Sequence, residues 1–245
     1  MPDAYNSMPA VVAHRGAGAF APENTAAAIS LAVELGATWC EVDVTISADG
    51  IAVIHHDADL ERCTNGHGLV IKHTLAELKQ LDAGSWFDAK YHQQRILTLA
   101  ELLVMANHLQ LGLNLEIKPT FGREEETVKA IAYELDKNPC QKHVLLSSFN
   151  VHALYEAKLQ LPHLTRALNT EAIPHNWQQR IAEVDAQGLH FQLEFFNAEQ
   201  VKSINDSGIN CAVFTVNDIS VARQLFAAGV NTIFSDYPNL LICPS

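Results

Sequence analysis

The sequence is short of basic residues and has none of the cysteine patterns that mark disulfide frameworks or zinc sites. Its 16 Lys and Arg stand against 28 Asp and Glu, for a formal net charge of -12. This balance opposes binding to nucleic acid or to anionic membranes in bulk, so an anionic ligand would need a local group of cations. The five cysteines form no CxxC pair, which favours a reducing cytoplasm; they are Cys40, Cys63, Cys140, Cys211 and Cys243.

Long hydrophobic runs are also missing. The longest uncharged stretch, residues 102–115, contains two Asn, a His and a Gln, and is shorter than the ~18–20 residues that a membrane span requires. The first ten residues lack a basic segment followed by an apolar core, so they do not predict a secretory signal. With 245 residues and 48% apolar content, we expect one domain, residues 1–245, without a membrane span.

What the sequence does have is a repeated alternation of apolar strands and amphipathic helices. Eight buried strands are predicted, at residues 10–14, 39–46, 111–117, 143–148, 165–168, 188–193, 211–216 and 231–235. Helical patterns fall between most of them, at residues 24–36, 99–109, 125–138, 151–160, 198–208 and 219–230. This alternation predicts an α/β fold of the (β/α)8 TIM-barrel type.

One segment departs from that alternation. Residues 47–97 follow the second strand, and the part at about 58–97 is interpreted as a small insertion over the barrel rim. Asp49 and Gly50 predict a two-residue type I′ hairpin turn, which places Asp43 opposite His56 on the antiparallel ladder. The aromatic residues of the insertion either cover the pocket or pack the insertion against the barrel; they are Trp86, Phe87 and Tyr91.

Polar residues close several of the predicted strands, where a parallel barrel carries its site. Glu41 and Asp43 lie two apart on one strand and therefore point to the same face. Together with Glu116 from the next barrel strand they offer only oxygen ligands, which suit a hard divalent cation, Mg2+ or Ca2+. The residue types do not choose between these two ions.

The chain resembles the glycerophosphodiester phosphodiesterase family, most closely its cytoplasmic bacterial type. The resemblance runs nearly end to end and rests on an ordered set of motifs: His14-Arg15-Gly16, Pro22-Glu23-Asn24-Thr25, Glu41-Val42-Asp43, His56-Asp57 with Leu60 and Arg62, Leu81-Asp82-Ala83-Gly84-Ser85-Trp86, Glu116-Ile117-Lys118-Pro119, Ser147-Ser148-Phe149 and Thr215-Val216-Asn217. Phe214 departs from the tryptophan often found ahead of Thr-Val-Asn in this family. Within the motif that starts at Pro22, residues 23–25 are interpreted as helix-capping chemistry.

The resemblance implies cleavage of deacylated phospholipid head groups, such as glycerophosphocholine, to sn-glycerol 3-phosphate and a free alcohol. It implies His14 and His56 as the catalytic pair, which share the work of general acid and base. Arg15 and Lys118 would bind the phosphate, and Glu41, Asp43 and Glu116 the metal. The family also implies attack by the glycerol 2-hydroxyl to give a cyclic phosphate, although direct attack by water stays open, as does which histidine is the acid.

Two alternatives remain at this stage. A related barrel phosphodiesterase acting on lysophospholipids would need a hydrophobic surface at the barrel rim or access to a membrane. The sequence gives no clear sign of either feature. A non-catalytic barrel that only holds phosphoesters would normally have lost a histidine or a metal carboxylate, whereas all five are present. The oligomeric state is not predicted, and the expected partner is a small-molecule glycerophosphodiester rather than nucleic acid.

Overall fold

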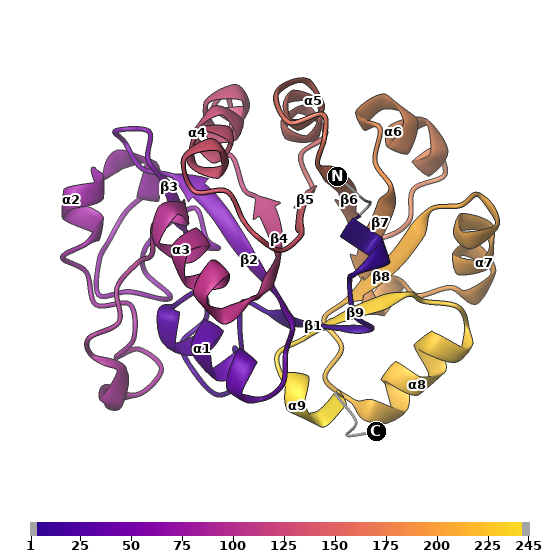
Figure 1. Ribbon diagram of the computed structural model, residues 1–245, viewed down its shortest axis with the longest axis horizontal. Helices are drawn as coiled ribbons and strands as arrows, with labels where there is room; N and C mark the ends of the chain where they lie inside the picture. The colour runs from indigo at the N-terminus through magenta and orange to yellow at the C-terminus, as the bar shows by residue number, and fades with distance from the viewer. Residues whose placement is uncertain (1–3, 242–245) are drawn as a thin grey trace.

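The computed structural model describes residues 4–241, which form a closed ring of eight parallel strands inside a ring of helices (Figure 1). β1 pairs with both β2 and β9 and so closes the barrel. The parallel strands are β1 (Val11–His14), β2 (Trp39–Ile46), β4 (Gly112–Ile117), β5 (Val144–Ser148), β6 (Thr165–Thr170), β7 (Gly188–Gln192), β8 (Asn210–Phe214) and β9 (Thr232–Ser235). The (β/α)8 TIM-barrel prediction is therefore confirmed, with all eight strands near their expected positions.

The outer helices alternate with these strands. They are α1 (Ala26–Glu34), α3 (Leu99–Leu109), α4 (Glu124–Lys137), α5 (Val151–Gln160), α6 (Trp177–Val184), α7 (Ala198–Asp206), α8 (Ile219–Ala227) and α9 (Pro238–Leu241). Polar side chains cap several of their N-termini; Thr25, for example, accepts a hydrogen bond from the Ala28 amide. The sequence patterns missed α6, although Trp177, Ile181 and Val184 are spaced along one helical face and are buried.

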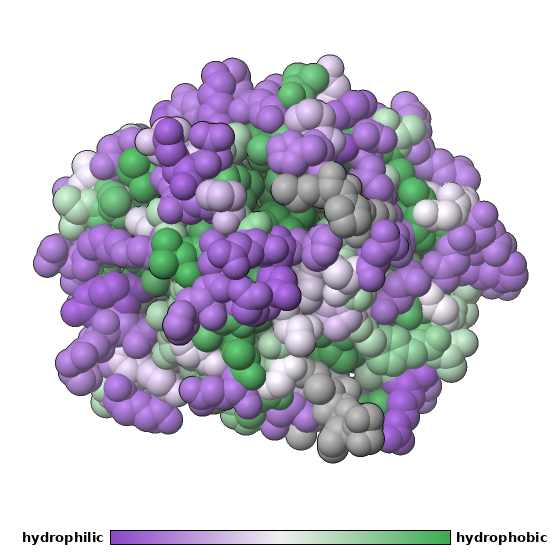
Figure 2. Space-filling view, viewed as in Figure 1, coloured by the Kyte–Doolittle hydropathy of each residue, from purple (hydrophilic) through white to green (hydrophobic). Residues whose placement is uncertain are grey.

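β2 is buried on both faces, which explains how carboxylates can lie inside an apolar fold. Its side chains alternate, so that Cys40, Val42 and Val44 pack outward against the helices, while Glu41 and Asp43 face the barrel interior. Most outer helices present hydrophilic residues to solvent in the view of Figure 2, as expected where their apolar sides cover the strands. Within the described part of the chain, every helix is too short or too polar to cross a bilayer.

β3 (Ala52–Ile54) pairs antiparallel with β2 and forms the expected hairpin, but the predicted register is wrong by one residue. Val44 lies opposite Ile54, and the His55 amide donates to the Asp43 carbonyl, so Asp43 faces His55 rather than His56. A type I′ turn needs positive φ at both central residues, whereas here only Gly50, at φ 78°, adopts it. Ser47 instead closes a three-residue loop, because its hydroxyl accepts from the Ile51 amide.

The segment from 58 to 97 contains α2 (Leu75–Leu78) and the short 3-10 helices η2 (Val70–Lys72) and η3 (Ala89–Tyr91). It has a small apolar core of its own, made with Val53, and lies beside α1 and α3 at the left of Figure 1. Its aromatic residues pack the segment rather than cover the pocket: the Trp86 indole donates to the Ala83 carbonyl, and the Tyr91 hydroxyl donates to the Phe20 carbonyl.

The opposite end of the barrel is closed by the N-terminal segment. The 3-10 helix η1 (Ala4–Asn6) lies across the ring of strands (Figure 1), and the Ala4 amide donates to the Thr165 hydroxyl at 2.9 Å. The Tyr5 side chain enters the barrel over Gly188, where a Cβ would stand 1.7 Å from the Tyr5 hydroxyl. Only glycine leaves room for the tyrosine at this position. The Tyr5 side chain therefore fills the end of the barrel opposite the carboxyl ends of the strands.

Candidate active site

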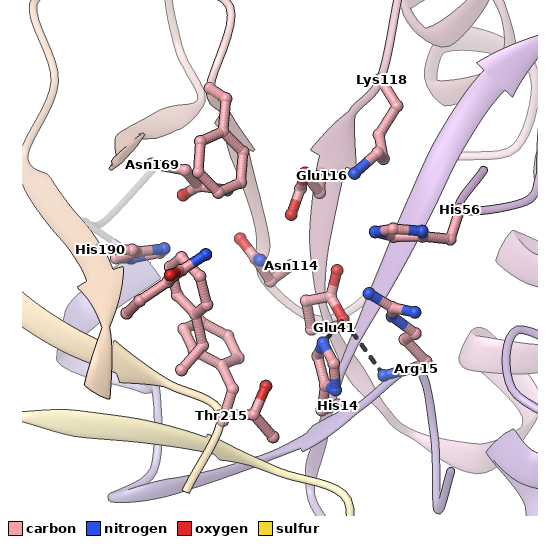
Figure 3. A pocket seen from close by; sticks show the side chains of 14 residues that line it. His14, Arg15, Glu41, His56, Asn114, Glu116, Lys118, Asn169, His190 and Thr215 are labelled. Carbon is pink, nitrogen blue, oxygen red and sulfur yellow. Dashed lines mark hydrogen bonds and ion pairs between the residues drawn. The ribbon is translucent and has the colours of Figure 1, made fainter. Parts of the chain in front are cut away.

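A cavity of about 230 Å³ opens at the carboxyl ends of the strands (Figure 3). It collects six of the seven residues predicted from the sequence, and the seventh, Asp43, contacts two of them. The lining residues are His14, Arg15, Glu41, His56, Asn114, Glu116, Lys118, Phe149, Asn169, His190, Gln192, Phe214, Thr215 and Phe234. Side chains far apart in the sequence thus meet at one end of the barrel.

The three carboxylates are brought together by strand register. Asp43 on β2 lies beside Glu116 on β4. Glu41 lies two residues before Asp43 on β2, so its side chain points to the same face of the strand. One oxygen of each carboxylate falls within 4.8 Å of the other two. Burial raises the pKa of Glu41 well above its usual range, and the neighbouring charges of Asp43 and Glu116 add to this rise. Burial, together with the charge of Asp43, likewise raises the pKa of Glu116.

Two cations partly balance this charge. The Nε of Arg15 lies 3.3 Å from an Asp43 oxygen, and the Nζ of Lys118 lies 3.7 Å from Asp43 and 3.2 Å from Glu116. Burial opposes ionisation of Asp43, but the charges of Arg15 and Lys118 outweigh it and lower the pKa of that carboxyl. Asp43 is therefore the carboxylate that stays ionised most readily in this cluster.

The donor set fits a divalent cation. Glu41 is 4% exposed; its Oε2 accepts from the Arg15 amide at 3.1 Å, whereas its Oε1 is buried without a hydrogen-bond partner. A buried carboxylate oxygen that nothing satisfies is costly unless a positive group reaches it. Three oxygen donors from two adjacent strands suit Mg2+ or Ca2+ rather than a thiolate-preferring ion. This cluster could therefore hold a metal ion.

His14 ends β1, and its imidazole is oriented by a residue from the other end of the chain. Its Nδ1 lies 2.7 Å from Asp236 Oδ1, and its Nε2 lies 3.9 Å from Glu41. Asp236 is itself held by Asn217, whose side-chain amide donates to its other oxygen at 2.8 Å. The carboxylate partner on Nδ1 leaves Nε2 directed to the cavity, as proton transfer requires.

His56 follows β3 and stands on the other side of the carboxylate cluster. Its Nδ1 lies 2.5 Å from Asp57 Oδ1, and Asp57 is paired with Arg62 at 2.7 Å. Burial lowers the pKa of His56, and the charges of Arg15 and Lys118 lower it further. His56 is thus held neutral near neutral pH, in a form that can accept a proton.

The motif at residues 23–25 does more than the capping expected for it. Thr25 caps α1, but the Asn24 amide donates to Asp43 Oδ2 at 2.9 Å, and Glu23 pairs with both Arg15 and Arg62. Burial opposes ionisation of Glu23, yet hydrogen bonds from the two arginines outweigh it and lower its pKa to about 2. Two of the three residues therefore position the cluster.

Four other contributors were also missed by sequence reasoning. Asp236 is a charged residue directly after an apolar strand, which is the same sequence signal that identified the predicted site residues. This signal could have identified Asp236 as well. Asn114, Asn169 and His190 are lone polar residues within strand patterns and gave no comparable signal.

A second cavity of about 330 Å³ adjoins the first and shares His56, Glu116, Lys118 and Phe149 with it. Its other walls include Pro119 and Phe121, a residue that is 97% exposed. Phe214 stands edge-to-face with Phe149 at 5.8 Å between ring centroids, so the phenylalanine keeps an aromatic wall where a tryptophan is common.

Two imidazoles flank a cluster of carboxylates and two cations at the carboxyl end of a parallel barrel. This arrangement offers proton acceptors and donors beside fixed positive charge, which is the chemistry that a hydrolase of phosphate esters needs.

Comparison with known proteins identifies the family to which this chain belongs. The model of the glycerophosphoryl diester phosphodiesterase family matches residues 14–240. A glycerophosphodiester phosphodiesterase from Caldanaerobacter subterraneus subsp. tengcongensis is 36% identical over 239 residues, which cover 95% of this chain and 96% of the relative. A glycerophosphodiester phosphodiesterase from Bacillus subtilis is 30% identical, over 94% of this chain and 84% of the relative.

Among solved structures, an Oleispira antarctica phosphodiesterase in complex with the product sn-glycerol-3-phosphate matches with a TM-score of 0.96 at 46% identity, over 98% of this chain and 97% of that chain. The chain belongs to the glycerophosphoryl diester phosphodiesterase family and is an enzyme, a phosphoric diester hydrolase.

Proposed function

We propose that this enzyme hydrolyses glycerophosphodiesters to sn-glycerol 3-phosphate and an alcohol, with the help of a divalent cation. The observation that carries the proposal is the convergence of His14, His56 and the carboxylates Glu41, Asp43 and Glu116 around one cavity. The Oleispira antarctica phosphodiesterase, whose fold matches with a TM-score of 0.96, was solved with sn-glycerol-3-phosphate, which supports this substrate class.

Arg15 and Lys118 bind the phosphate in this proposal. A phosphodiester carries one negative charge, and attack on phosphorus moves charge onto its oxygens, so fixed cations stabilise the transition state more than the ground state. Arg15 is well held for this role, because its guanidinium donates to Glu23 at 2.7 Å and approaches Asp43. A divalent cation held by Glu41, Asp43 and Glu116 would supply further Lewis-acid stabilisation of that charge.

His14 and His56 share the proton transfers. One takes the proton of the attacking hydroxyl, and the other delivers a proton to the departing alkoxide, each worth roughly 10²- to 10⁴-fold in rate. Both have a carboxylate on Nδ1, so both present Nε2 to the cavity. Attack by the glycerol 2-hydroxyl would give a cyclic phosphate that water then opens with the histidines in exchanged roles.

The cation is Mg2+ or Ca2+ in this proposal, and the adjoining cavity beside Phe121 and Phe149 offers room for the leaving alcohol. The runner-up substrate, a lysophospholipid, is disfavoured because Tyr5 and His190 close the base of the main cavity, so an acyl chain on a glycerol seated there could not extend in that direction. We further propose a single domain for residues 1–245 and a cytoplasmic location, which the free thiols of Cys40, Cys63, Cys140 and Cys211 favour.

The test measures turnover of glycerophosphocholine, glycerophosphoethanolamine and lysophosphatidylcholine, with a dehydrogenase-coupled assay for glycerol 3-phosphate on the first two substrates and an assay for released choline on the third. Each substrate is assayed with Mg2+, with Ca2+ and with excess EDTA. The proposal expects turnover of the two deacylated substrates that EDTA stops and one of the cations restores. Product formation that is unchanged in EDTA would contradict metal dependence, and activity confined to the lysophospholipid would contradict the substrate class.

A further inference from the structure

The base of the main cavity carries two buried amide side chains whose oxygens have no partner. Asn114 on β4 is 1% exposed and Asn169 on β6 is 4% exposed. Both donate their amide nitrogen to the hydroxyl of Ser147, at 3.1 and 3.4 Å, and both oxygens are buried without a hydrogen bond. Ser147 occupies only one end of each amide, so each asparagine keeps one buried oxygen without a protein partner, and both residues line the cavity.

His190 on β7 completes this wall. Its Nε2 is engaged by the Tyr5 hydroxyl at 2.7 Å, and its ring packs against Phe234 with 5.1 Å between centroids. Burial lowers the pKa of His190 to about 3, so the imidazole is neutral and offers one nitrogen, Nδ1, beyond the tyrosine contact. In Figure 3, Asn169 and His190 lie across the cavity from His56 and Lys118, with Asn114 between them.

The wall formed by Asn169 and His190 is uncharged. Asn114 lies beside Glu41 at the edge of the carboxylate cluster, and the far wall carries His56 and Lys118. A phosphate is held by charge, so the uncharged wall is suited to the uncharged part of a substrate that has hydroxyl groups. Buried polar atoms without partners destabilise the free protein, and a ligand that satisfies them regains that free energy on binding.

We propose that Asn114, Asn169 and His190 form a hydroxyl-binding subsite that receives the terminal hydroxyl of the glycerol moiety and makes these residues determinants of specificity. The proposal rests on the proposed function, because it assigns the glycerol end of the diester to the closed base of the cavity. Tyr5 is a positioning residue in it: its hydroxyl bonds Nε2 of His190, fixes the ring and thereby leaves Nδ1 for the ligand.

The orientation of the substrate follows. With the glycerol end against Asn169 and His190 and the phosphate beside Arg15 and Lys118, the leaving alcohol is directed toward the second cavity at Phe121. The terminal oxygen of the glycerol must then be a free hydroxyl. A substituent on it would meet the Tyr5 side chain, which packs against Gly188.

The experiment compares ligands that differ by this single hydroxyl. Binding of sn-glycerol 3-phosphate and of 2-hydroxypropyl phosphate, which keeps the 2-hydroxyl but lacks the terminal one, is measured by calorimetry on the metal-loaded protein. The wild-type protein is expected to prefer glycerol 3-phosphate by roughly 10²-fold, because a site built to hydrogen-bond a hydroxyl rejects an analogue that leaves its polar groups unpaired. The same preference is expected in kcat/KM for glycerophosphocholine over 2-hydroxypropyl phosphocholine.

Asn169→Ala is expected to reduce the preference to below about 10-fold, since the amide that rejects the analogue is gone. Asn210→Ala is the matched control, because Asn210 is a strand asparagine at the start of β8, where its amide donates to the Gln187 carbonyl. It is expected to keep the wild-type preference. Tyr5→Phe removes the bond to His190 and is expected to weaken the preference in both measurements.

Equal binding of the two phosphates by the wild-type protein would overturn the inference without any variant, and so would an Asn169→Ala protein that keeps the full preference. These outcomes are separate from failure of the proposed function. Absence of turnover on any glycerophosphodiester, with the binding preference intact, would refute the function while supporting the subsite.

Discussion

Replacing Glu41 by glutamine should stabilise the metal-free protein while it abolishes metal binding. Glu41 has a pKa raised well above 4.5 by burial and by the charges of Asp43 and Glu116. A carboxyl whose folded pKa exceeds its unfolded pKa stabilises the fold when protonated, and this contribution is lost as the pH rises through the folded pKa. Near neutral pH, where the carboxyl of an unfolded chain is ionised, burying Glu41 is therefore a net cost to the metal-free fold.

The free energy that this buried carboxyl costs the fold is limited by the difference in proton binding between the folded and unfolded chains. Between the ordinary pKa of 4.5 and pH 7, each pH unit is worth about 1.36 kcal/mol, so burying this carboxyl destabilises the metal-free fold by no more than about 3 kcal/mol. We expect Glu41→Gln to recover about 1–3 kcal/mol in the presence of EDTA. For a chain of this size, that corresponds to a rise in Tm of about 3–10 °C.

The assay is thermal unfolding followed by circular dichroism, with EDTA and with saturating Mg2+ or Ca2+. The wild-type protein should gain about 2.7 kcal/mol from a cation present at 100 times its Kd, and Glu41→Gln should gain far less. The difference in Tm between the two proteins in EDTA should narrow as the pH falls toward 4.5. Glu34→Gln, an exposed position at the end of α1, serves as the control and should change neither quantity.

The reasoning is refuted if Glu41→Gln melts at or below the wild-type temperature in EDTA, since the buried repulsion would then be absent. A cation-induced rise in Tm that survives in the variant would remove Glu41 from the metal site.

His14→Ala and His56→Ala should each lower kcat by about 10²- to 10⁴-fold with an unchanged circular dichroism spectrum, while the exposed His108→Ala should not; a near wild-type rate would remove that histidine from the mechanism. Asp236→Asn should lower kcat at least about 10-fold, because the charge that orients His14 is lost, and an unaltered kcat would show that Asp236 does not position it. The acid limb of kcat/KM should lie below pH 6.5, because burial and the charges of Arg15 and Lys118 disfavour the protonated form of His56. Asp57→Asn should move this limb to still lower pH, because the hydrogen bond that favours the imidazolium is gone; a shift to higher pH would contradict that assignment.

The strands and the polar residues that end them were predictable because both depend on local patterns. Short apolar runs separated by helical patterns indicate barrel strands, and the parallel pairing of β2 with β4 then places Asp43 beside Glu116. The hairpin register was not predictable from Asp49 and Gly50 alone. It depends on the Ser47 hydroxyl, which accepts from the Ile51 amide and so selects a longer loop.

The missed residues act through contacts that no local pattern reveals. Asp236 reaches His14 across 222 positions of sequence, and Tyr5 reaches His190 across 185. Asn114 and Asn169 meet only through Ser147 on the strand between them. Their importance follows from barrel closure, which decides which strands become neighbours and which side chains are buried without partners.

The contact between His14 and Asp236 joins the two ends of the chain, so we expect the site to be complete only when β9 is in place beside β1. His14 is translated among the first residues, but its carboxylate partner follows β9, the strand that seals the ring against β1. A nascent polypeptide still tethered to the ribosome before residue 236 emerges has all three metal carboxylates and both imidazoles, yet one imidazole has no partner to orient it. A fragment truncated ahead of β9 is therefore expected to be inactive, because it lacks both the strand that closes the barrel and the carboxylate that orients His14.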